Sequence, residues 1–429
     1  MSYMIDKYRD PVHGFIEVRS LENEIINSMP FQRLRNIKQL AMTYLVFHGA
    51  EHTRFGHSLG VMHLVSNAFR SAISNGPEFL SKEKKDWYEQ ILRLIALLHD
   101  IGHAPFSHAS ESVFPDGTEH EDYTEKIIKE TCIADIISKI GTEYKAKYGK
   151  EYDITPELIC DIYMRRIPGE NSEFVFLSSF MDGELDCDKM DYLLRDSLYC
   201  GVNYGKYDVQ RLISCLTVYR EEGGSPRLAV MHGGVQAFEE FVLARYFMFV
   251  QVYFHRTRRY FDIMLKSALE KILDNGKYPE NIEEYLSWDD CKVIELMKEK
   301  CDSIKECDNI VNRKVYAMVL DTKTHPEEAD KREFRMMRNI LYEKFGRNNF
   351  IEDQSADKMP HKIPIRTAID DEKAIVIINE RTGKNTTISE ESQIISSLTN
   401  KINIQRIYAN KEYSMEAENC IRSTYKDII

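Results

Sequence analysis

Three separate stretches of the sequence place histidine or aspartate beside an apolar run. His99-Asp100 follows the run LRLIALL, His57 begins HSLGVMHLV, and Asp188 lies within DGELDCDKMDYLLRDS. A carboxylate is costly to bury unless it is paired or binds a metal. Two imidazoles and two carboxylates make a mixed nitrogen and oxygen donor set, which suits Fe, Mn, Zn or Mg. We therefore predict that His57, His99, Asp100 and Asp188 hold a divalent metal ion.

The adjacent His99-Asp100 pair has a structural alternative, because polar residues are common at the end of a helix. The distribution of histidine favours a functional site instead, since eight of the thirteen histidines fall between His48 and His120. Histidine is the commonest metal ligand and titrates near neutral pH. This clustering indicates a metal or catalytic site.

These side chains require helices that converge. We expect one buried helix from His57, a second that ends near Gly102, and a third that begins at Glu184 and contains Asp188. The segment YRDPVHGFIEV predicts a strand or hairpin, and TYLVF predicts a strand. A long helix rich in aromatic residues is expected over residues 235–273.

After about residue 275 the sequence becomes polar and carries no chemical motif. The segments AIVIIN and INIQRIYA predict strands, with the helical SEESQIISSLTNKI between them. We therefore expect a catalytic domain over residues 1–275 and an accessory region over 276–429, with a small α/β unit at 365–410. The predicted fold class is mainly α, with a small α/β lobe at the C-terminus.

The composition excludes several classes of protein. The net charge is −12, whereas proteins that wrap nucleic-acid polymers usually carry excess Lys and Arg. No apolar run is long enough to span a membrane, and the N-terminus lacks the apolar region of a signal peptide. Nine scattered cysteines without a CxxC pair suit the reduced cytoplasm. We expect a cytoplasmic protein with neither a membrane nor a nucleic-acid polymer as partner.

The pattern His57…His99-Asp100…Asp188 resembles the H…HD…D signature of the HD phosphohydrolase superfamily. The blocks RDPVHG, FQRLRNIKQL, HTRFGHSLGV, LLHDIGHAPFSH and DCDKMDYLLRD resemble, in this order, the deoxynucleoside triphosphate triphosphohydrolases. The resemblance covers residues 5–265. It implies a helical HD-domain core that binds a divalent metal, with Mg accompanying the nucleotide phosphates.

The resemblance also implies residue roles. Asp188 would orient a metal-bound water, and His120, or His103 with it, would protonate the departing 5′-oxygen. Substrate contacts are implied for Arg54, Gln39, Leu40, His108, Lys189, Tyr192, Asp196, Arg245 and Tyr253. Among them, Tyr192 would pack against the sugar where a 2′-hydroxyl would lie, and Asp196 would hydrogen-bond the 3′-hydroxyl.

Structural alternatives remain for these residues. Each histidine could be a structural residue, Arg54 could tie a loop, and the residues that follow Asp188 could form a solvated helix face. The block that contains Arg245 and Tyr253 matches poorly, and its aromatic residues are typical of a core.

The implied reaction is attack of water on the α-phosphorus of a deoxynucleoside triphosphate, giving a deoxynucleoside and inorganic triphosphate. One rival function is an HD phosphohydrolase for a monophosphate, a cyclic nucleotide or an alarmone, which would share the four ligands but need not share DKMDYLLRD. A second rival is a nucleotide-binding regulator with low turnover.

The resemblance further implies a homo-oligomer, either a dimer or a tetramer, and an activating nucleotide at a second site. Gln32 and Arg35 match that second site, but Asn27 stands where some relatives carry an Asp that reads guanine. Gly56 replaces an acidic residue often found just before the first histidine ligand.

Overall fold

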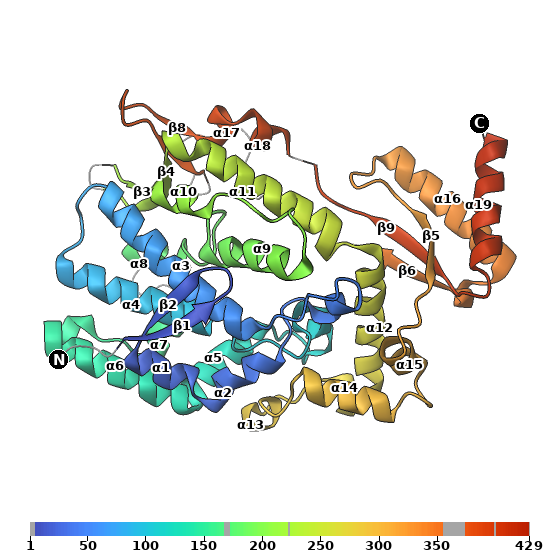
Figure 1. Cartoon of the computed structure of the whole chain (residues 1–429), viewed down its shortest axis with the longest axis horizontal. Helices are drawn as coiled ribbons and strands as arrows, with labels where there is room; N and C mark the ends of the chain where they lie inside the picture. The colour runs from blue at the N-terminus through green and yellow to red at the C-terminus, as the bar shows by residue number, and fades with distance from the viewer. Residues whose placement is uncertain (1–4, 167–171, 222–223, 355–373, 399, 429) are drawn as a thin grey trace.

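The helical part of the chain is built around three helices, two of which pack on the first (Figure 1). They are α3 (Arg54–Asn75), α4 (Lys82–Leu98) and α9 (Cys187–Cys200). In this computed structural model, residues 5–166, 172–221, 224–354, 374–398 and 400–428 are described. Helix α3 buries residues on most of its faces, because α4 and α9 both pack on it. It therefore forms the centre of the helical lobe.

The ends of these helices follow from local capping. Ser81 caps α4, its hydroxyl accepting a hydrogen bond from the Lys84 amide, and Asp186 caps α9 by accepting from the Lys189 amide. Helix α9 stops at Gly201, whose φ of 69° favours glycine. The three helices were expected, but α3 begins at Arg54 and α4 already ends at Leu98, so His99 and Asp100 lie just beyond its last residue.

Before the central helices, strands β1 (Ile5–Asp10) and β2 (Gly14–Arg19) form the expected antiparallel hairpin, followed by α1 (Ser20–Ile26) and α2 (Met29–Gln32). The turn ends at Gly14, whose φ is +78°. The other helices of this lobe are α5 (His120–Glu130), α6 (Cys132–Tyr148), α7 (Pro156–Tyr163), α8 (Ser172–Ser178), α10 (Val209–Ser214), α11 (Val235–Met248), α12 (Arg256–Ile272), α13 (Ile282–Tyr285), α14 (Asp290–Glu299) and α15 (Lys305–Val311).

Two predicted elements differ in the structure. TYLVF is not a strand, because residues Ala41–Leu45 form a 3-10 helix, with hydrogen bonds from the amides of Thr43 and Val46 to carbonyls three residues earlier. The long aromatic helix is two helices, α11 and α12. A π-helical turn at Phe249–Tyr253 joins them, and His255, with ψ of 130°, ends the helical path.

Strands β3 (Leu216–Tyr219), β4 (Arg227–Met231), β7 (Val376–Ile378) and β8 (Asn385–Thr387) form one small sheet in the order β3-β4-β7-β8. β7 runs parallel to β4, and the other pairs are antiparallel. Helices α17 (Ile388–Glu391) and α18 (Gln393–Ser397) follow β8.

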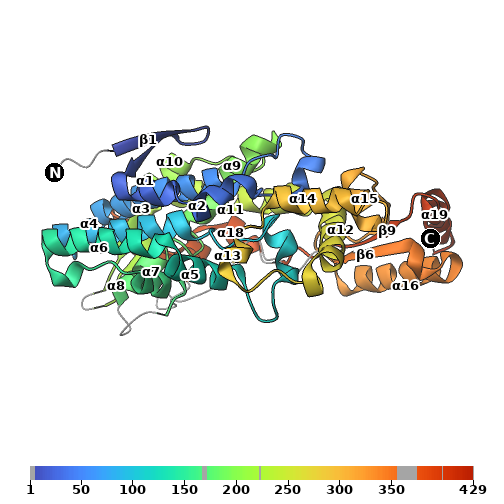
Figure 2. The same cartoon turned by 90° about the horizontal axis from the view of Figure 1, so that it is seen from below.

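A separate α/β lobe lies at one end of the long axis in both views (Figures 1 and 2). Its sheet has the order β5-β9-β6, with β5 (Ala317–Asp321), β9 (Gln405–Ala409) and β6 (Phe350–Gln354), and is covered by α16 (Glu328–Phe345) and α19 (Ser414–Ile428). Its own core includes Phe334, Met337, Leu341, Ile407 and Ala417.

The mainly α fold with a small C-terminal α/β lobe is confirmed, but the lobe is not the strand–helix–strand unit expected at 365–410. The first expected strand, β7, pairs with β4 of the helical lobe, and only β9 belongs to the C-terminal sheet. The start of that expected unit lies outside the described residues. The domain division at residue 275 stays a prediction.

Candidate active site

Four side chains meet in what we call the central cluster: His57, His99, Asp100 and Asp188. The Nε2 atom of His57 lies 3.0 Å from Asp188 Oδ1 and 3.5 Å from Asp100 Oδ2. The Nε2 atom of His99 lies 3.3 Å from Asp100 Oδ1 and 3.7 Å from Asp188 Oδ1. Helices α3, α4 and α9 thus bring together the four side chains selected from the sequence.

Both imidazoles present Nε2 to this cluster. The Nδ1 of His99 donates to the Ala96 carbonyl at 2.8 Å, and the Nδ1 of His57 donates to Asp191 at 2.8 Å. In each ring Nδ1 carries the donated proton, so Nε2 is the nitrogen that would bind a metal ion, and in His57 the metal would replace a proton there. His99 Nε2 is buried without a hydrogen-bond partner. An orphaned imidazole nitrogen among carboxylate oxygens fits a divalent metal site.

The electrostatics of the cluster favour positive charge at this place. Burial lowers the pKa of His57, but hydrogen bonds to Asp188 and Asp191 outweigh burial and raise the pKa to about 10. Burial opposes ionisation of Asp188, yet contacts with His57 and His99 hold its pKa below the ordinary value. Such a site stabilises a proton or a metal cation.

A second layer of side chains fixes His57. Asp191, fully buried on α9, accepts from His57 and also from Arg195, whose Nε and Nη2 lie 2.7 and 2.9 Å from its oxygens. The Nε2 of His13 lies 2.6 Å from Asp191, and Arg195 donates to Asp10 at 2.9 Å. Sequence reasoning gave these four residues no role, although all of them lie inside the blocks RDPVHG and DCDKMDYLLRD.

Gly60 explains why α3 and α9 approach closely enough for this contact. A Cβ atom at residue 60 would lie 1.9 Å from Asp191 Oδ1 and 2.5 Å from Arg195 Nη2. Because these atoms belong to a buried ion pair, no small movement would relieve the clash. The absence of a side chain at Gly60 therefore permits the hydrogen bond that orients His57.

Next to the central cluster lies what we call the histidine cluster: His103, His108, Glu111 and His120. Glu111 Oε1 lies 3.2, 2.9 and 2.9 Å from the Nδ1 atoms of His103, His108 and His120. The rings of His103 and His120 stack with centroids 3.8 Å apart. Their spacing is also compatible with a metal ion. Glu111 was missed, although its position three residues after His108 was a usable signal.

The two clusters are in contact, because His103 Nε2 lies 3.2 Å from Asp100 Oδ1. Burial, Arg54 and His120 lower the pKa of His103 to about 3, so this ring is neutral at pH 7. The helix expected to end near Gly102 already ends at Leu98, where the chain turns. This turn is what lets residues 99, 100 and 103 face the same space.

Arg54 lies at the start of α3 and is almost completely buried. Its Nη1 donates to Asp100 Oδ2 at 2.5 Å, and its Nε donates to the Ser107 hydroxyl at 2.7 Å. The guanidinium group thus lies beside the central cluster, one helical turn before His57. Its expected role as a phosphate ligand stays a prediction.

Along α9, the predicted substrate residues lie beyond the central cluster. Lys189 pairs with Asp186. Burial raises the pKa of Asp186 to about 6, because burial and the neighbouring Asp188 together outweigh the lowering by Lys189. Tyr192 faces Tyr253, with ring centroids 6.2 Å apart. The structure therefore brings Tyr253 to the same helix face, although its sequence block matched poorly.

Asp196 is buried, and both of its carboxylate oxygens have partners. His52 Nε2 lies 2.7 Å from Oδ1, and the Tyr253 hydroxyl donates to Oδ2 at 2.6 Å. The sequence analysis did not identify His52, because its partner Asp196 lies 144 residues later and no local pattern predicts their contact. A sugar hydroxyl could still donate to a remaining lone pair of this carboxylate.

The other predicted substrate residues are partly or fully buried. Arg245 lies on α11, 3.6 Å from Glu184 and over the ring of Phe249. Gln39 has a buried side-chain oxygen without a hydrogen-bond partner, and Leu40 is buried beside it in the chain. All these substrate contacts stay predictions.

The residues predicted for an activating site lie at the end of α2. Gln32 donates to the Ile26 carbonyl at 2.7 Å, and Arg35 donates to Gln32 at 2.8 Å and stacks over Phe55. An activating nucleotide and the oligomeric state stay predictions.

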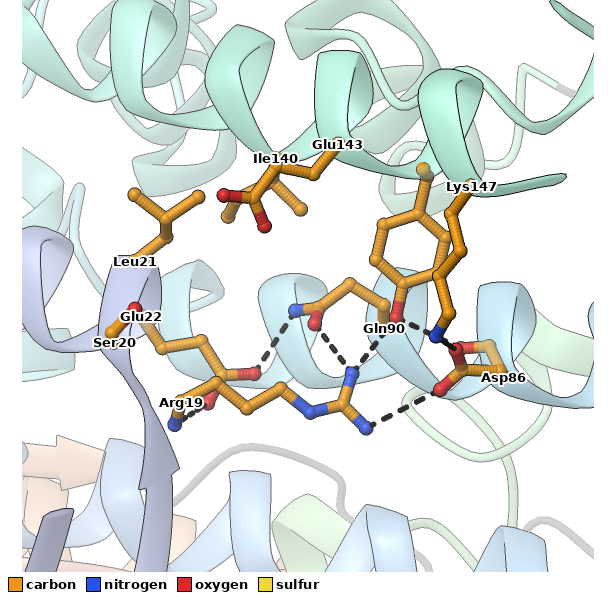
Figure 3. A pocket seen from close by; sticks show the side chains of 10 residues that line it. Arg19, Ser20, Leu21, Glu22, Asp86, Gln90, Ile140, Glu143 and Lys147 are labelled. Atoms are coloured by element: carbon orange, nitrogen blue, oxygen red, sulfur yellow. Dashed lines mark hydrogen bonds and ion pairs between the residues drawn. The ribbon is translucent and has the colours of Figure 1, made fainter. Parts of the chain in front are cut away.

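A pocket of about 250 Å³ lies apart from both clusters, between α1, α4 and α6 (Figure 3). Arg19 donates to Gln90 at 2.5 Å and to Tyr144 at 3.0 Å, and Lys147 pairs with Asp86 at 3.0 Å. Because its cations already pair with groups of the protein, we do not assign this pocket as the functional site.

The fold and the central cluster define a metal-binding HD domain, and comparison with known proteins agrees. Residues 54–160 match the HD domain, and residues 207–423 match the HD associated region. The chain therefore belongs to the HD-domain family and is an HD-superfamily phosphohydrolase, like the deoxynucleoside triphosphate triphosphohydrolases in its family.

Several relatives cover much of the chain. It is 32% identical to the uncharacterized protein MJ1154 of Methanocaldococcus jannaschii, over 82% of this chain and 69% of that one. A crystal structure of a hypothetical protein from Aquifex aeolicus has a TM-score of 0.79 at 33% identity, covering 97% of this chain and all of that one.

A relative with a named activity is the deoxynucleoside triphosphate triphosphohydrolase SAMHD1 of Gallus gallus, 31% identical over 62% of this chain and 45% of that protein. This chain thus matches less than half of SAMHD1. Within the described residues, no helix is both long and apolar enough to cross a membrane.

Proposed function

We propose that this protein hydrolyses deoxynucleoside triphosphates to a deoxynucleoside and inorganic triphosphate. The arrangement of α9 carries this proposal. Asp188 contributes to the central cluster, and Tyr192 and Asp196 follow one and two turns later, beside Tyr253. The helical rise puts Asp196 about 12 Å beyond Asp188, a length comparable to a bound nucleotide. The similarity to SAMHD1 supports the same substrate class.

His57, His99, Asp100 and Asp188 would hold the divalent metal, as Fe, Mn, Zn or Mg, with Mg also accompanying the phosphates. When bound, the metal supplies Lewis acidity and lowers the pKa of a water at the site. The Asp188 side chain is 33% exposed, whereas those of His57, His99 and Asp100 are nearly buried. Asp188 is therefore the group that would orient an attacking water toward the α-phosphorus.

His120 would protonate the departing 5′-oxygen, with His103 beside it. The side chain of His120 is 16% exposed and that of His103 is 1% exposed, so a substrate can reach His120 more readily. Glu111 Oε1 lies within hydrogen-bond distance of the Nδ1 atoms of both rings and would orient them. His103 would then fix the position of His120 through ring stacking.

The remaining predicted contacts form two groups, one for the phosphates and one for the sugar and base. Arg54, Lys189, His108 and Arg245 would contact phosphates, since cationic groups match phosphate oxygens. The sugar and base would lie against Gln39, Leu40, Tyr192, Asp196 and Tyr253. We also propose a homo-oligomer, dimer or tetramer, with an activating nucleotide near Gln32 and Arg35.

The test is product analysis by chromatography. Metal-reconstituted protein is incubated with four deoxynucleoside and four ribonucleoside triphosphates, singly and mixed, because a mixture supplies any activator. We expect a deoxynucleoside and intact triphosphate, and a loss of about 1,000-fold or more in kcat for Asp188→Ala, which removes a group of the metal site.

Orthophosphate as the product would contradict attack at the α-phosphorus, and pyrophosphate with a deoxynucleoside monophosphate would contradict departure of the 5′-oxygen. Nucleotide binding without turnover in any mixture would favour a regulatory protein instead. Asp208→Asn is the matched control, because Asp208 is exposed and only caps α10.

A further inference from the structure

The segment Tyr278–Asp290 is hydrogen-bonded to the loop that carries His103, His108 and Glu111. We call residues 278–290 the brace and residues 102–113 the histidine loop. The Tyr278 amide donates to the Val113 carbonyl at 3.0 Å, and the Tyr285 hydroxyl donates to the Gly102 carbonyl at 2.7 Å. The brace therefore holds both ends of the histidine loop.

The middle of the histidine loop has an unfavourable backbone conformation. Phe106 and Ser107 have φ values of 60° and 56°, in the left-handed region that residues with a side chain rarely adopt. Two such residues in succession persist only where surrounding contacts enforce them. His108 follows directly, so the conformation at this point determines where the rest of the loop runs.

Asp290 provides such a contact. Its Oδ1 accepts a hydrogen bond from the Phe106 amide at 2.7 Å, and its Oδ2 accepts from the Lys38 amide at 2.9 Å. The carboxylate is buried, with 4% of the residue exposed. One side chain of α14 therefore joins two backbone segments, the histidine loop and the segment that leads into Gln39 and Leu40.

A further hydrogen bond joins the same two segments. The Ser107 hydroxyl donates to the Lys38 carbonyl at 2.7 Å and accepts from Arg54 Nε at 2.7 Å. Loss of the Asp290 carboxylate would release the Phe106 and Lys38 amides together. The direct effect would reach the histidine loop and Arg54, whereas the helices that carry His57 and Asp188 have no hydrogen bond to Asp290 among those described.

We propose that Asp290 is a positioning residue, and that the brace sets the placement of His103, His108 and Glu111 for the reaction. This inference rests on the proposed function for its substrate. It assigns a task to residues 278–290 of the HD associated region, a segment in which the sequence shows no chemical motif. Asp290 itself would touch neither substrate nor metal.

The test compares Asp290→Ala and Asp290→Asn with Asp289→Ala. Asp289 is the matched control, because it caps the same helix through the Lys292 amide and accepts from the Asn36 side chain, but has no hydrogen bond to the histidine loop among those described. We expect Asp290→Ala to lower kcat by about 10- to 100-fold, with KM and metal content within about 3-fold of the wild type. Asp289→Ala should keep kcat within about 3-fold.

Hydrogen–deuterium exchange supplies a readout independent of activity. In Asp290→Ala, we expect exchange to accelerate by about 10-fold or more in peptides covering 102–113, but not in peptides from α9. Asp290→Asn keeps the shape of the side chain but accepts hydrogen bonds with only one oxygen. It should show the same acceleration of exchange in residues 102–113, and it serves as the test if the alanine variant does not fold.

The two proposals fail in distinguishable ways. If the wild type is active and both Asp290 variants keep kcat and the protection of the histidine loop unchanged, the positioning role of the brace is wrong, whereas the proposed reaction is not affected. Equal losses of kcat and loop protection in Asp289→Ala would also overturn that positioning role. An inactive wild type, with exchange accelerated as expected in the Asp290 variants, would overturn the proposed reaction and support the brace.

Discussion

At the scale of single residues, the imidazole of His57 lies between two carboxylates with different tasks. Asp188 faces its Nε2 in the central cluster, while Asp191 accepts from its Nδ1. Such a carboxylate behind a metal-binding imidazole fixes the tautomer and increases the basicity of the ligand nitrogen. Arg195 and His13 in turn hold Asp191.

We predict that Asp191→Asn weakens metal binding by about 10- to 100-fold, the usual effect of removing an outer-shell partner. The amide cannot accept at both positions, so His57 loses its fixed orientation. Competition with a chromogenic chelator would measure the affinity. Asp208→Asn should leave the affinity unchanged, and equal affinities for wild type and Asp191→Asn would contradict this role for Asp191.

The sequence identified the four side chains of the central cluster, but not the residues that hold His57 in place. Asp191 lies three residues after Asp188 on the same helix, so helical spacing could have identified it. Arg195 follows Asp191 by four residues and could have been identified from the same helical spacing. His13 could not be found this way, because 178 residues separate it from Asp191 and only the fold brings them together.

At the scale of elements, a buried ion pair fastens the N-terminal hairpin and α1 to α4 (Figure 3 shows Glu22). Glu22 accepts from Arg93 through both oxygens, at 2.7 and 2.6 Å, and from Gln90 at 2.9 Å. Burial raises the pKa of Glu22, but Arg93 and Arg19 outweigh burial and hold the pKa below its ordinary value.

We predict that Glu22→Gln lowers the free energy of unfolding by about 3 kcal/mol at pH 7, because Arg93 loses its charged partner in the core. A lowered folded-state pKa stabilises the protein above the unfolded pKa, and this stabilisation is lost as the pH falls through the folded value. The difference between wild type and variant should therefore shrink below about pH 4. Urea denaturation at several pH values measures it.

The matched control is Glu24→Gln, since Glu24 is exposed on the same helix and lies 3.4 Å from Lys139. Surface pairs contribute little, so we expect a change below about 1 kcal/mol. A difference between wild type and Glu22→Gln that does not depend on pH would contradict the assigned ionisation.

Element types were predictable where the sequence is periodic, and boundaries were not. The apolar period identified α3, α4 and α9, but the end of α4 at Leu98 depends on the turn that directs His99 and Asp100 into the site. TYLVF has strand-forming residues, yet it folds as a 3-10 helix, with Leu45 partly buried against the core and no described strand to pair with. Tertiary packing overrides local propensity in such short segments.

At the scale of the whole molecule, contacts across the chain join the two lobes. Asp353 of β6 is buried and accepts from Arg259 of α12 at 2.7 Å, and Arg406 of β9 donates to the same carboxylate at 3.0 Å. Sequence patterns predicted a C-terminal lobe and predicted β7 and β9 correctly as strands, but wrongly placed both strands in one unit. The pairing of β7 with β4 joins segments far apart in the chain, and no local pattern encodes such a pairing.

The central claim, water attack at the α-phosphorus of a deoxynucleoside triphosphate, is tested most directly by isotope labelling. The reaction is run in ¹⁸O-enriched water, and the masses of both products are measured by mass spectrometry. We predict one ¹⁸O atom in each triphosphate and none in the deoxynucleoside, because attack at phosphorus breaks the bond to the 5′-oxygen. Label in the deoxynucleoside, or release of pyrophosphate in place of triphosphate, would contradict the account.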